Sequence, residues 1–336
     1  MMTDILKIKE VIKNSQKVTI ISHYSPDGDA LASQLALARG LEQIEIEISL
    51  INKDPIPDAY QFLKNWECIK PLEEIPDFAS VIICVDCATW ERTGYLKEQL
   101  IGEKTIVINI DHHISNTNFG HLNWVDPNAA ATAELIYDLL GLLQVKIDKI
   151  IATSIYTGIS TDTGSFLYEN TTATTHIVVA DLINRGADIN LVRNSYYENI
   201  NISKINLLKY GLNNLSFSVD NQVCWVAFTR DVFNNANATD ADGEGLINHL
   251  KSISGVEVAI IFRETTSDTI KLSFRSKKWA DVNQLASKYG GGGHPRAAGC
   301  TITGNLDSVV DGVINWVVQS IAQGGTSKFG WDNKCT

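Results

Sequence analysis

The sequence predicts an α/β protein with an N-terminal, mostly parallel sheet flanked by helices and a smaller C-terminal α/β domain joined to it by a helical linker. Three observations carry this prediction. Apolar runs alternate with helical patterns over residues 1–160, helix-like stretches fill 172–215, and alternating apolar runs return after residue 216. The length of 336 residues is enough for two domains with sizeable cores.

Four apolar runs in the first part of the chain predict strands: "KVTIIS", "EIEISLIN", "SVIICVD" and "TIVINID". Amphipathic or loop segments separate them, a pattern typical of βαβ units and a parallel sheet. A helical pattern follows, from "ATAELIYDLLGLLQ" to "KIIATSIYTGISTDTGSF", and breaks at Gly164. Since ligands of such sheets bind beyond the carboxyl ends of the strands, functional residues are expected at that edge.

The pattern changes in the second half of the chain. "TTHIVVADLINRGAD" and "SKINLLKYGLNNL" predict helices, whereas "FSVDNQVCWVAFTR", "VEVAIIFRET" and "TIKLSFRSK" alternate as strands do. We therefore expect a first domain over 1–190, a helical linker over 191–215, a second domain over 216–325 and a tail over 326–336.

The composition, with 44% hydrophobic and 20% charged residues, is that of a soluble globular protein. No apolar run approaches the roughly 20 residues of a membrane span, and the charged start "MMTDILKIKE" lacks the apolar centre of a signal peptide. We expect a cytoplasmic protein without a membrane partner. The net charge of −11 argues against a protein that coats long duplex nucleic acid. It leaves room for a short phosphorylated substrate held by metals and a few cations.

The six cysteines are scattered and form no disulfide framework for a chain of this length. Cys84 and Cys87 spell "CVDC", which suggests a metal or redox site. The pair sits inside the apolar run "VIICVDCA", however, and the sequence has no second CxxC. We therefore predict that both are small buried side chains.

Acidic and imidazole side chains gather where the predicted strands and helices end. Any one of them could cap a helix or pack in a core, but four distant segments deliver them to one edge. So many like charges in one crevice would repel and be costly to desolvate unless divalent cations neutralise them. The candidates are His23, Asp27, Asp29, Asp86, Asp111, His112, His113 and Asp162.

This set of donors narrows the choice of metal. It contains no thiolate, which disfavours structural zinc. Mixed imidazole and carboxylate donors suit Mn²⁺, with Co²⁺, Fe²⁺ or Zn²⁺ as alternatives, whereas Mg²⁺ usually takes oxygen donors and water.

Five motifs in order resemble a known family. "HYSPDGDA", "VD" in "IICVDCA", "DHH" at 111–113 and "TDTG" at 161–164 are similar to the motif series of the DHH phosphoesterases, and "GGGGHPRAAG" at 290–299 is similar to the signature of the DHHA1 domain. Within that family the domain pair most resembles the NrnA-type bifunctional oligoribonucleases and pAp phosphatases. One departure is Ala32, where a glycine is more usual; it affects helix packing rather than chemistry.

The resemblance implies a DHH catalytic domain that holds two divalent cations, with Mn²⁺ preferred. His23 and Asp27 would bind one ion and Asp29 the other. Asp86 would bridge both ions and so act as a ligand and a catalytic residue.

The remaining residues of the "DHH" and "TDTG" motifs would complete the site. His112 and Asp162 would bind the second ion, Asp111 would orient a neighbouring ligand, and His113 would contact the phosphate. The implied reaction is hydrolysis of a phosphoester by a hydroxide that bridges the two ions. No P-loop pattern GxxxxGK[ST] competes with this interpretation.

The second domain is expected to recognise the substrate. Residues 263–296 carry seven Lys or Arg against three acids, a positive window in an acidic protein. Glycine-rich backbone can approach an anion closely, and the resemblance implies that Arg275 and His294 bind phosphate. The candidate substrate-binding residues are Arg275, Gly292, Gly293, His294 and Arg296. Arg92, in "WERTG", either helps to position the metal site or forms a structural salt bridge.

The function implied is hydrolysis of short oligoribonucleotides (nanoRNA) and of 3′-phosphoadenosine 5′-phosphate (pAp). A phosphodiesterase for linear or cyclic dinucleotides, such as pApA or cyclic di-AMP, is the nearest alternative. A catalytically inactive nucleotide-binding sensor is an alternative of another class. The presence of all six ligand positions argues against the sensor, and the resemblance leaves a homodimer open.

Overall fold

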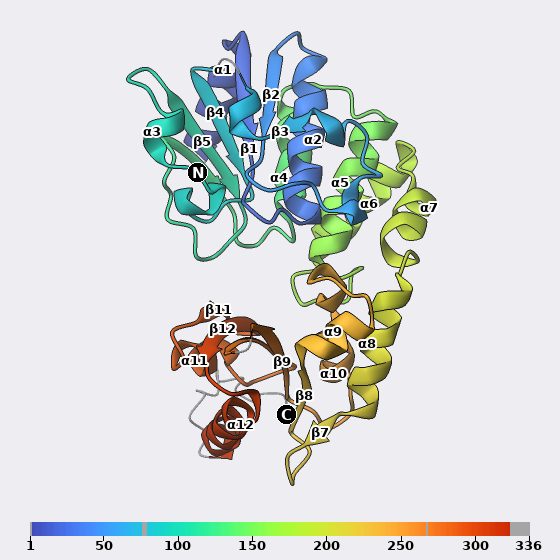
Figure 1. The fold of residues 1–336 in the computed structure, drawn as a ribbon. Helices are drawn as coiled ribbons and strands as arrows, with labels where there is room; N and C mark the ends of the chain where they lie inside the picture. The colour runs from blue at the N-terminus through green and yellow to red at the C-terminus, as the bar shows by residue number, and fades with distance from the viewer. Residues whose placement is uncertain (1, 76–78, 267, 323–336) are drawn as a thin grey trace, which may run out of the picture. The chain divides into compact units, whose positions relative to one another are not determined.

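The computed structural model describes residues 2–75, 79–266 and 268–322 (Figure 1). Contacts between residues divide the chain into two units, Met1–Asn199 and Ile200–Thr336. Each unit is built on one six-stranded sheet, which confirms the predicted α/β class. Among the described residues no helix has the length and apolar character needed to cross a membrane.

The sheet of the first unit, expected to be mostly parallel, has the order β3-β2-β1-β4-β5-β6, and all its strand pairs in the described residues are parallel. Its strands are β1 (Lys17–Ile21), β2 (Glu47–Ile51), β3 (Ile69–Lys70), β4 (Val81–Val85), β5 (Ile106–Asp111) and β6 (Leu122–Val125). The chain runs outward from β1 to β3 and then returns to place β4 beside β1. The strand order therefore reverses between β1 and β4, which is where sheets of this kind bind ligands.

Helices and short helical turns surround this sheet. The α-helices are α1 (Met2–Lys13), α2 (Gly28–Glu42), α3 (Lys97–Leu100), α4 (Thr132–Leu142), α5 (Lys149–Asp162), α6 (Ala173–Asn184) and α7 (Ile189–Val192). Single turns of 3-10 helix span Asp58–Tyr60, Trp66–Cys68, Leu72–Glu74 and Trp90–Thr93, and a π-helix spans Arg193–Tyr197.

The strand side chains alternate between two apolar cores because successive residues of a strand point to opposite faces. Val18 and Ile20 belong to the larger core, which the sheet shares with α2, α4 and α5. Ile21 and Ile82 belong to the smaller core on the other face, together with Trp90. Figure 1 shows α2, α4 and α5 grouped beside the first sheet.

The two cysteines of "CVDC" lie in the smaller core. Cys84 and Cys87 are buried, reduced and not paired with each other. Burial raises the pKa of both thiols above the ordinary value of a cysteine. The prediction that both are small buried side chains is confirmed.

The sheet of the second unit is mixed, with the order β11-β12-β10-β9-β8-β7. Its strands are β7 (Ser216–Phe217), β8 (Val223–Phe228), β9 (Val258–Thr266), β10 (Thr269–Ser276), β11 (Gly292–His294) and β12 (Ala297–Thr303). Its helices are α8 (Ile202–Asn213), α9 (Arg230–Asn235), α10 (Leu246–Lys251), α11 (Val282–Ser287) and α12 (Leu306–Ala322), with one 3-10 turn at Ala241–Gly243. Among the described strands of this sheet, only β8 and β9 pair in parallel.

Helix α8 falls inside the segment expected to be a linker, yet it packs on the second unit. Leu207 of α8 is fully buried in a core that also contains Phe228 of β8. The domain limits proposed from the sequence otherwise stay a prediction, and the expected tail over 326–336 lies outside the described residues.

Helices α2 and α5 run antiparallel at close range, and glycines make this approach possible. A Cβ on Gly158 would come within 2.7 Å of Asp29 Oδ1 and within 3.3 Å of Ala32 Cβ. A Cβ on Gly28 would lie 2.4 Å from Thr161 Oγ1. The start of α2 therefore lies against the end of α5, which brings two predicted metal-binding segments together.

The opposite ends of the two helices are joined by an ion pair. Asp148 caps α5 by accepting bonds from the N–H groups of Ile150 and Ile151. The Arg39 guanidinium of α2 donates to both oxygens of the same carboxylate, with Nη2 2.7 Å from Oδ2. Burial opposes ionisation, but these hydrogen bonds lower the pKa of Asp148 below its ordinary value.

Replacing Asp148 by alanine should lower the free energy of unfolding by about 1–3 kcal/mol, from the lost cap and the lost, partly exposed ion pair. Asp148→Asn, which keeps a capping oxygen, should lose less. Because the pKa is lower in the folded state, this stabilisation is present above the unfolded value of about 3.9 and is lost as pH falls through the folded value. Urea unfolding of both variants at pH 7 checks this; equal stability of Asp148→Ala and the parent protein contradicts it.

Candidate metal centre

The first group of candidate ligands follows β1. The strand ends at Ile21, and His23 lies two residues later with 5% of its surface exposed. Asp27 caps α2 by accepting bonds at 3.1 Å from the N–H groups of Asp29 and Ala30. The cap fixes where α2 begins and so places Asp29, which is buried, in its first turn.

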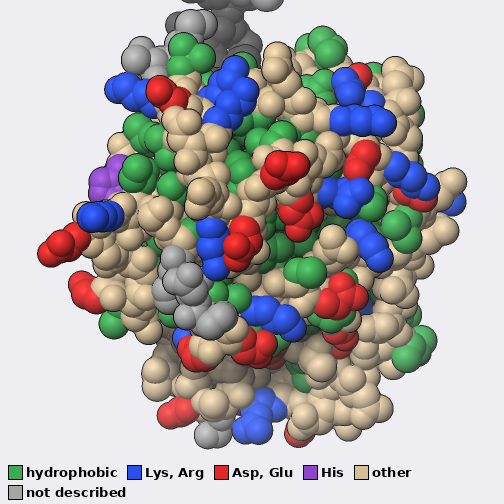
Figure 2. Space-filling view, turned by 90° about the horizontal axis from the view of Figure 1, so that it is seen from above, with side chains coloured by type: hydrophobic (Ala, Val, Ile, Leu, Met, Phe, Trp, Pro, Cys, Tyr) green, Lys and Arg blue, Asp and Glu red, His purple; other side chains and the backbone are tan. Residues whose placement is uncertain are grey.

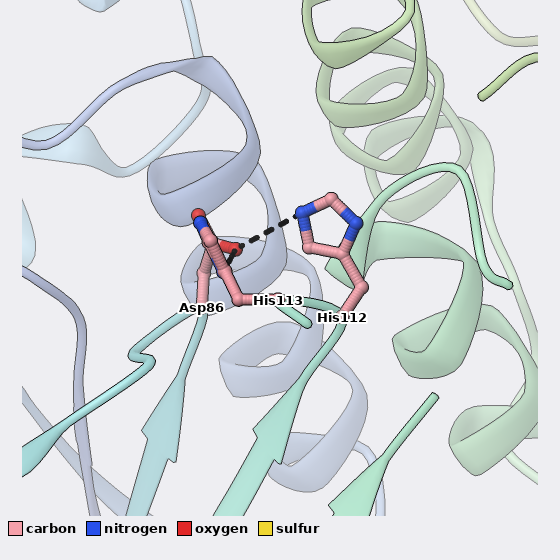
Figure 3. A group of neighbouring side chains, drawn as sticks. All are labelled: Asp86, His112 and His113. Carbon is pink, nitrogen blue, oxygen red and sulfur yellow. Dashed lines mark ion pairs between the residues drawn. The ribbon is translucent and has the colours of Figure 1, made fainter. Parts of the chain in front are cut away.

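Asp86 lies directly after β4, at the point where the strand order reverses. Its backbone is left-handed, with φ of 58°, a conformation in which aspartate is among the better tolerated residues. Its N–H donates to the carbonyl of Ile110 at 3.0 Å, which anchors the turn to β5. The carboxylate is almost fully buried and faces His112 and His113 (Figure 3).

The third and fourth segments approach the same carboxylate. Asp111 is the last residue of β5, and His112 and His113 follow it, while Asp162 is the last residue of α5. Asp86 Oδ1 lies 3.8 Å from His112 Nε2 and 3.7 Å from His113 Nδ1. His112 Nε2 lies 3.5 Å from Asp162 Oδ2.

The six predicted metal ligands lie in two groups of three, and Asp86 belongs to one and faces His112 of the other. His23, Asp27 and Asp86 form one group, whose donor atoms all lie within 4.8 Å of one another. A second group contains Asp29, His112 and Asp162, and a third joins Asp86 to His112 and His113. Asp86 Oδ2 lies 3.5 Å from His23 Nε2, so its two oxygens face different groups.

Both imidazoles turn Nε2 toward the carboxylates, and in the neutral ring this nitrogen has the lone pair that a metal needs. Nδ1 of His23 donates to the Tyr24 carbonyl at 2.8 Å, and Nδ1 of His112 donates to the Ala129 carbonyl at 3.2 Å. Since a carbonyl can only accept, Nδ1 carries the proton in each ring. Nε2 is then the metal-binding atom, with the backbone fixing the ring as metal-bound histidines require.

Asp111 lies outside the three groups and holds His113 instead. It is completely buried, and its Oδ1 accepts a bond from His113 Nδ1 at 2.7 Å. Asn116 donates to the other oxygen at 2.5 Å. Burial alone would raise the pKa of Asp111, but these bonds lower it, so the group is a carboxylate that fixes the His113 ring.

The pKa shifts of the acids and histidines show that the site needs positive charge. Burial and the carboxylates of Asp86 and Asp162 hold the pKa of Asp29 well above its ordinary range. Burial likewise raises the pKa of Asp162 to about 7. Burial would lower the pKa of His23, but hydrogen bonds to Asp27 and Asp86 outweigh it and raise the pKa to about 10. Without metal ions the site therefore binds protons, which divalent cations would displace.

The donors fit a pair of divalent cations. Two groups, one of His23, Asp27 and Asp86 and the other of Asp29, His112 and Asp162, each offer one imidazole nitrogen and carboxylate oxygens. None of these donors is a thiolate. Such a set suits transition metals such as Mn²⁺ better than structural zinc. Uncompensated, the same carboxylates would repel one another in a buried space.

The candidate substrate residues lie together in the second unit, at one end of β10, β11 and β12. Arg275 pairs with Ala297, and Ala297 pairs with His294, so these positions form a row across three strands. The Ser276 N–H donates to the carbonyl of Arg296 at 3.1 Å. The side chain of His294 lies outside the described part of the structure.

The two candidate glycines lie in a strand of this sheet. Gly292 and Gly293 belong to β11 and pair with β12. Gly293 has φ of 150°, and a Cβ there would come within 2.4 Å of the Ala297 carbonyl oxygen, so a glycine is required by strand packing. Arg296 Nη1 donates to the Ala280 carbonyl at 2.9 Å, which ties this guanidinium to the fold.

Sequence reasoning missed two side chains that touch the candidate ligands. Thr132 donates its hydroxyl to Asp86, and Asn170 donates its amide to the backbone carbonyl of Asp162 at 3.2 Å. Neither has a spacing from the motifs that would reveal it. For Arg92, which the sequence did indicate, Nη2 lies 3.3 Å from His23 Nδ1 and the guanidinium lies over the Tyr24 ring, which favours the positioning role over a salt bridge.

Comparisons with known proteins agree with this geometry. Two family models match the chain: the N-terminal domain of the DHH family over residues 17–159 and the DHHA1 domain over residues 222–319. The bifunctional oligoribonuclease and PAP phosphatase NrnA of Thermus thermophilus is 32% identical over 328 residues, 95% of this chain and 94% of that protein. The protein of the same name from Bacillus subtilis is 32% identical over 83% of this chain and 87% of its own.

A solved structure is similar over the whole length. The exopolyphosphatase-related protein from Bacteroides fragilis superposes with a TM-score of 0.89 at 26% identity, covering 96% of this chain and 97% of that chain. The resemblance inferred from five motifs is thus confirmed at the level of the family. The chain belongs to the DHH/DHHA1 phosphoesterase family, as an NrnA-like member.

Proposed function

We propose that the protein hydrolyses phosphoester bonds of short oligoribonucleotides and of pAp, with two Mn²⁺ ions bound around Asp86. The observation that carries this proposal is the position of the Asp86 carboxylate, whose oxygens face two separate groups of donors. A lone structural ion would not need a carboxylate shared between two groups. The names of the two NrnA relatives support the choice of substrates.

The residues of the site divide the work of such a reaction. When bound, a pair of divalent cations lowers the pKa of water and polarises a phosphoryl oxygen, so no side chain has to act as nucleophile. The six proposed ligands hold the ions. His113, whose Nδ1 is bonded to Asp111, is held with a fixed ring plane and would contact the substrate phosphate.

Substrate charge would be met by the second unit. Arg275 and His294 lie in register on β10 and β11, on either side of Ala297 of β12, and a guanidinium is suited to binding phosphate. On the face drawn in Figure 2, acidic and basic side chains are interspersed, and the whole chain has a net charge of −11. This distribution supports a short substrate over a long duplex, which requires many Lys or Arg contacts to phosphate.

A panel of substrates tests the proposed function. Metal-free protein should be inactive, and added Mn²⁺ should restore hydrolysis of pAp and of a dinucleotide, with much slower turnover of a 24-mer and of cyclic di-AMP. Initial rates at matched concentrations measure this. Faster turnover of cyclic di-AMP than of either short substrate would favour the cyclic dinucleotide phosphodiesterase, and no turnover of any would favour a sensor.

Asp86→Ala should lower kcat by at least about 100-fold, equivalent to about 2.7 kcal/mol of activation free energy, because it removes the carboxylate that joins both groups. Asp86→Asn, which tolerates the left-handed backbone, should lose activity similarly. Asp126→Ala is a matched control, since that carboxylate bonds to Asn128 in a turn. Turnover near that of the parent protein in either Asp86 variant, with the fold checked by circular dichroism, would refute the bridging role.

Arg275→Ala should lower kcat/KM for pAp, mainly by raising KM. The loss should correspond to about 1–3 kcal/mol of transition-state stabilisation, the range expected for a lost charge-assisted hydrogen bond. Lys271→Ala removes a positive charge from the exposed part of the same strand and is the control for a general loss of charge. Steady-state kinetics of both variants distinguish the two effects. Equal losses would place Arg275 outside the binding site.

A further inference from the structure

We infer that Thr132 is a positioning residue, which aims the Asp86 carboxylate so that each of its oxygens serves a different metal ion. The inference rests on the proposed two-metal function and adds a residue that no motif includes. It follows from the contacts of one side chain at the start of α4.

Thr132 is the first residue of α4, is fully buried, and contacts two candidate ligands at once. Its hydroxyl donates to Asp86 Oδ1 at 2.9 Å, and its backbone N–H donates to Asp29 Oδ2 at 2.6 Å. The next N–H, from Ala133, donates to Asp29 Oδ1 at 2.9 Å. One residue therefore links carboxylates that come from α2 and from the end of β4.

The hydrogen bonds from the backbone N–H groups of Thr132 and Ala133 to Asp29 cap the start of α4. The first N–H groups of a helix have no partners within the helix, and the residue before α4, Ala131, has no side chain that could accept them. The Asp29 carboxylate accepts them instead. The position of Thr132 is thus fixed independently of its hydroxyl.

The hydroxyl half selects an orientation of the Asp86 carboxylate. The terminal torsion of aspartate is broad, so little in the side chain itself resists rotation of its two oxygens. Asp86 Oδ2 faces His23 Nε2 at 3.5 Å, while Oδ1 faces His112 Nε2 at 3.8 Å. A carboxylate oxygen accepts along two lone pairs. The Thr132 bond takes one direction of Oδ1 and leaves the other toward the His112 group.

Loss of the hydroxyl should therefore weaken the binding of one ion more than the binding of the other. Asp86 Oδ1 would be free to turn away from the group of His112, Asp29 and Asp162, whereas Asp27 and His23 would still hold the other ion. Partners of metal ligands typically change metal affinity by 10–100-fold when removed.

The test compares two substitutions of nearly equal shape in the full-length protein. Thr132→Val removes the hydroxyl but keeps the branched side chain and the N–H bonded to Asp29. Thr132→Ser keeps the hydroxyl. Titration of metal-free protein with Mn²⁺, with free Mn²⁺ followed by electron paramagnetic resonance, gives the number of ions and their affinities without relying on turnover.

The parent protein and Thr132→Ser should bind two ions, and Thr132→Val should bind one normally and the second about 10–100-fold more weakly. At limiting Mn²⁺ the kcat of Thr132→Val for pAp should fall and should recover with excess Mn²⁺, with KM for pAp unchanged. Thr157→Val is the control, since Thr157 is a buried threonine whose hydroxyl donates to the Thr153 carbonyl within α5.

The outcomes separate this inference from the function on which it rests. If the parent protein binds fewer than two ions, the two-metal proposal itself is wrong. If it binds two and Thr132→Val binds both with parental affinity, the positioning role of Thr132 is wrong. Should circular dichroism show that Thr132→Val is unfolded, Thr132→Ala, which suits a helix, provides the same comparison.

Discussion

The mutual repulsion of carboxylates held together in a buried space is the constraint on which the rest of the first unit depends. Asp29, Asp86 and Asp111 are almost fully buried within one site. The fold meets part of this cost with hydrogen bonds: helix N–H groups bond to Asp29, a threonine hydroxyl to Asp86, and His113 and Asn116 to Asp111. What remains is a demand for positive charge, which protons or divalent cations can meet.

The fold brings these charged residues together at one edge of the sheet. The strand order reverses between β1 and β4, so His23 and Asp86 leave the sheet at adjacent positions of the same edge. Pairing of β5 with β4 brings the Asp111–His113 segment to the same edge, and glycines at the crossing of α2 and α5 let the end of α5, with Asp162, approach Asp29. Each part is an ordinary device of α/β folds, and the metal centre results from their coincidence.

Much of this could be predicted from the sequence, because apolar runs followed by acids or histidines mark the ends of buried parallel strands. The sequence did not indicate β3, β6, β11 or β12. The first three are short, and β11 and the start of β12 fall in the glycine-rich motif, so none has a recognisable apolar period. Thr132 and Asn170 could not be predicted either, since their contacts with Asp86 and Asp162 arise only when distant segments pack. Gly292 and Gly293, expected to let backbone approach an anion, belong to β11, and strand packing requires a glycine at Gly293; their role in binding stays a prediction.

Membership of the DHH/DHHA1 family, the donor groups around Asp86 and the positive window of the second unit all point to a metal-dependent phosphoesterase with small charged substrates. The most direct measurement is anomalous diffraction at the manganese edge from crystals grown with Mn²⁺. The account predicts two peaks, one on each side of the Asp86 carboxylate. A single peak that does not contact Asp86, or two peaks elsewhere in the molecule, would contradict it.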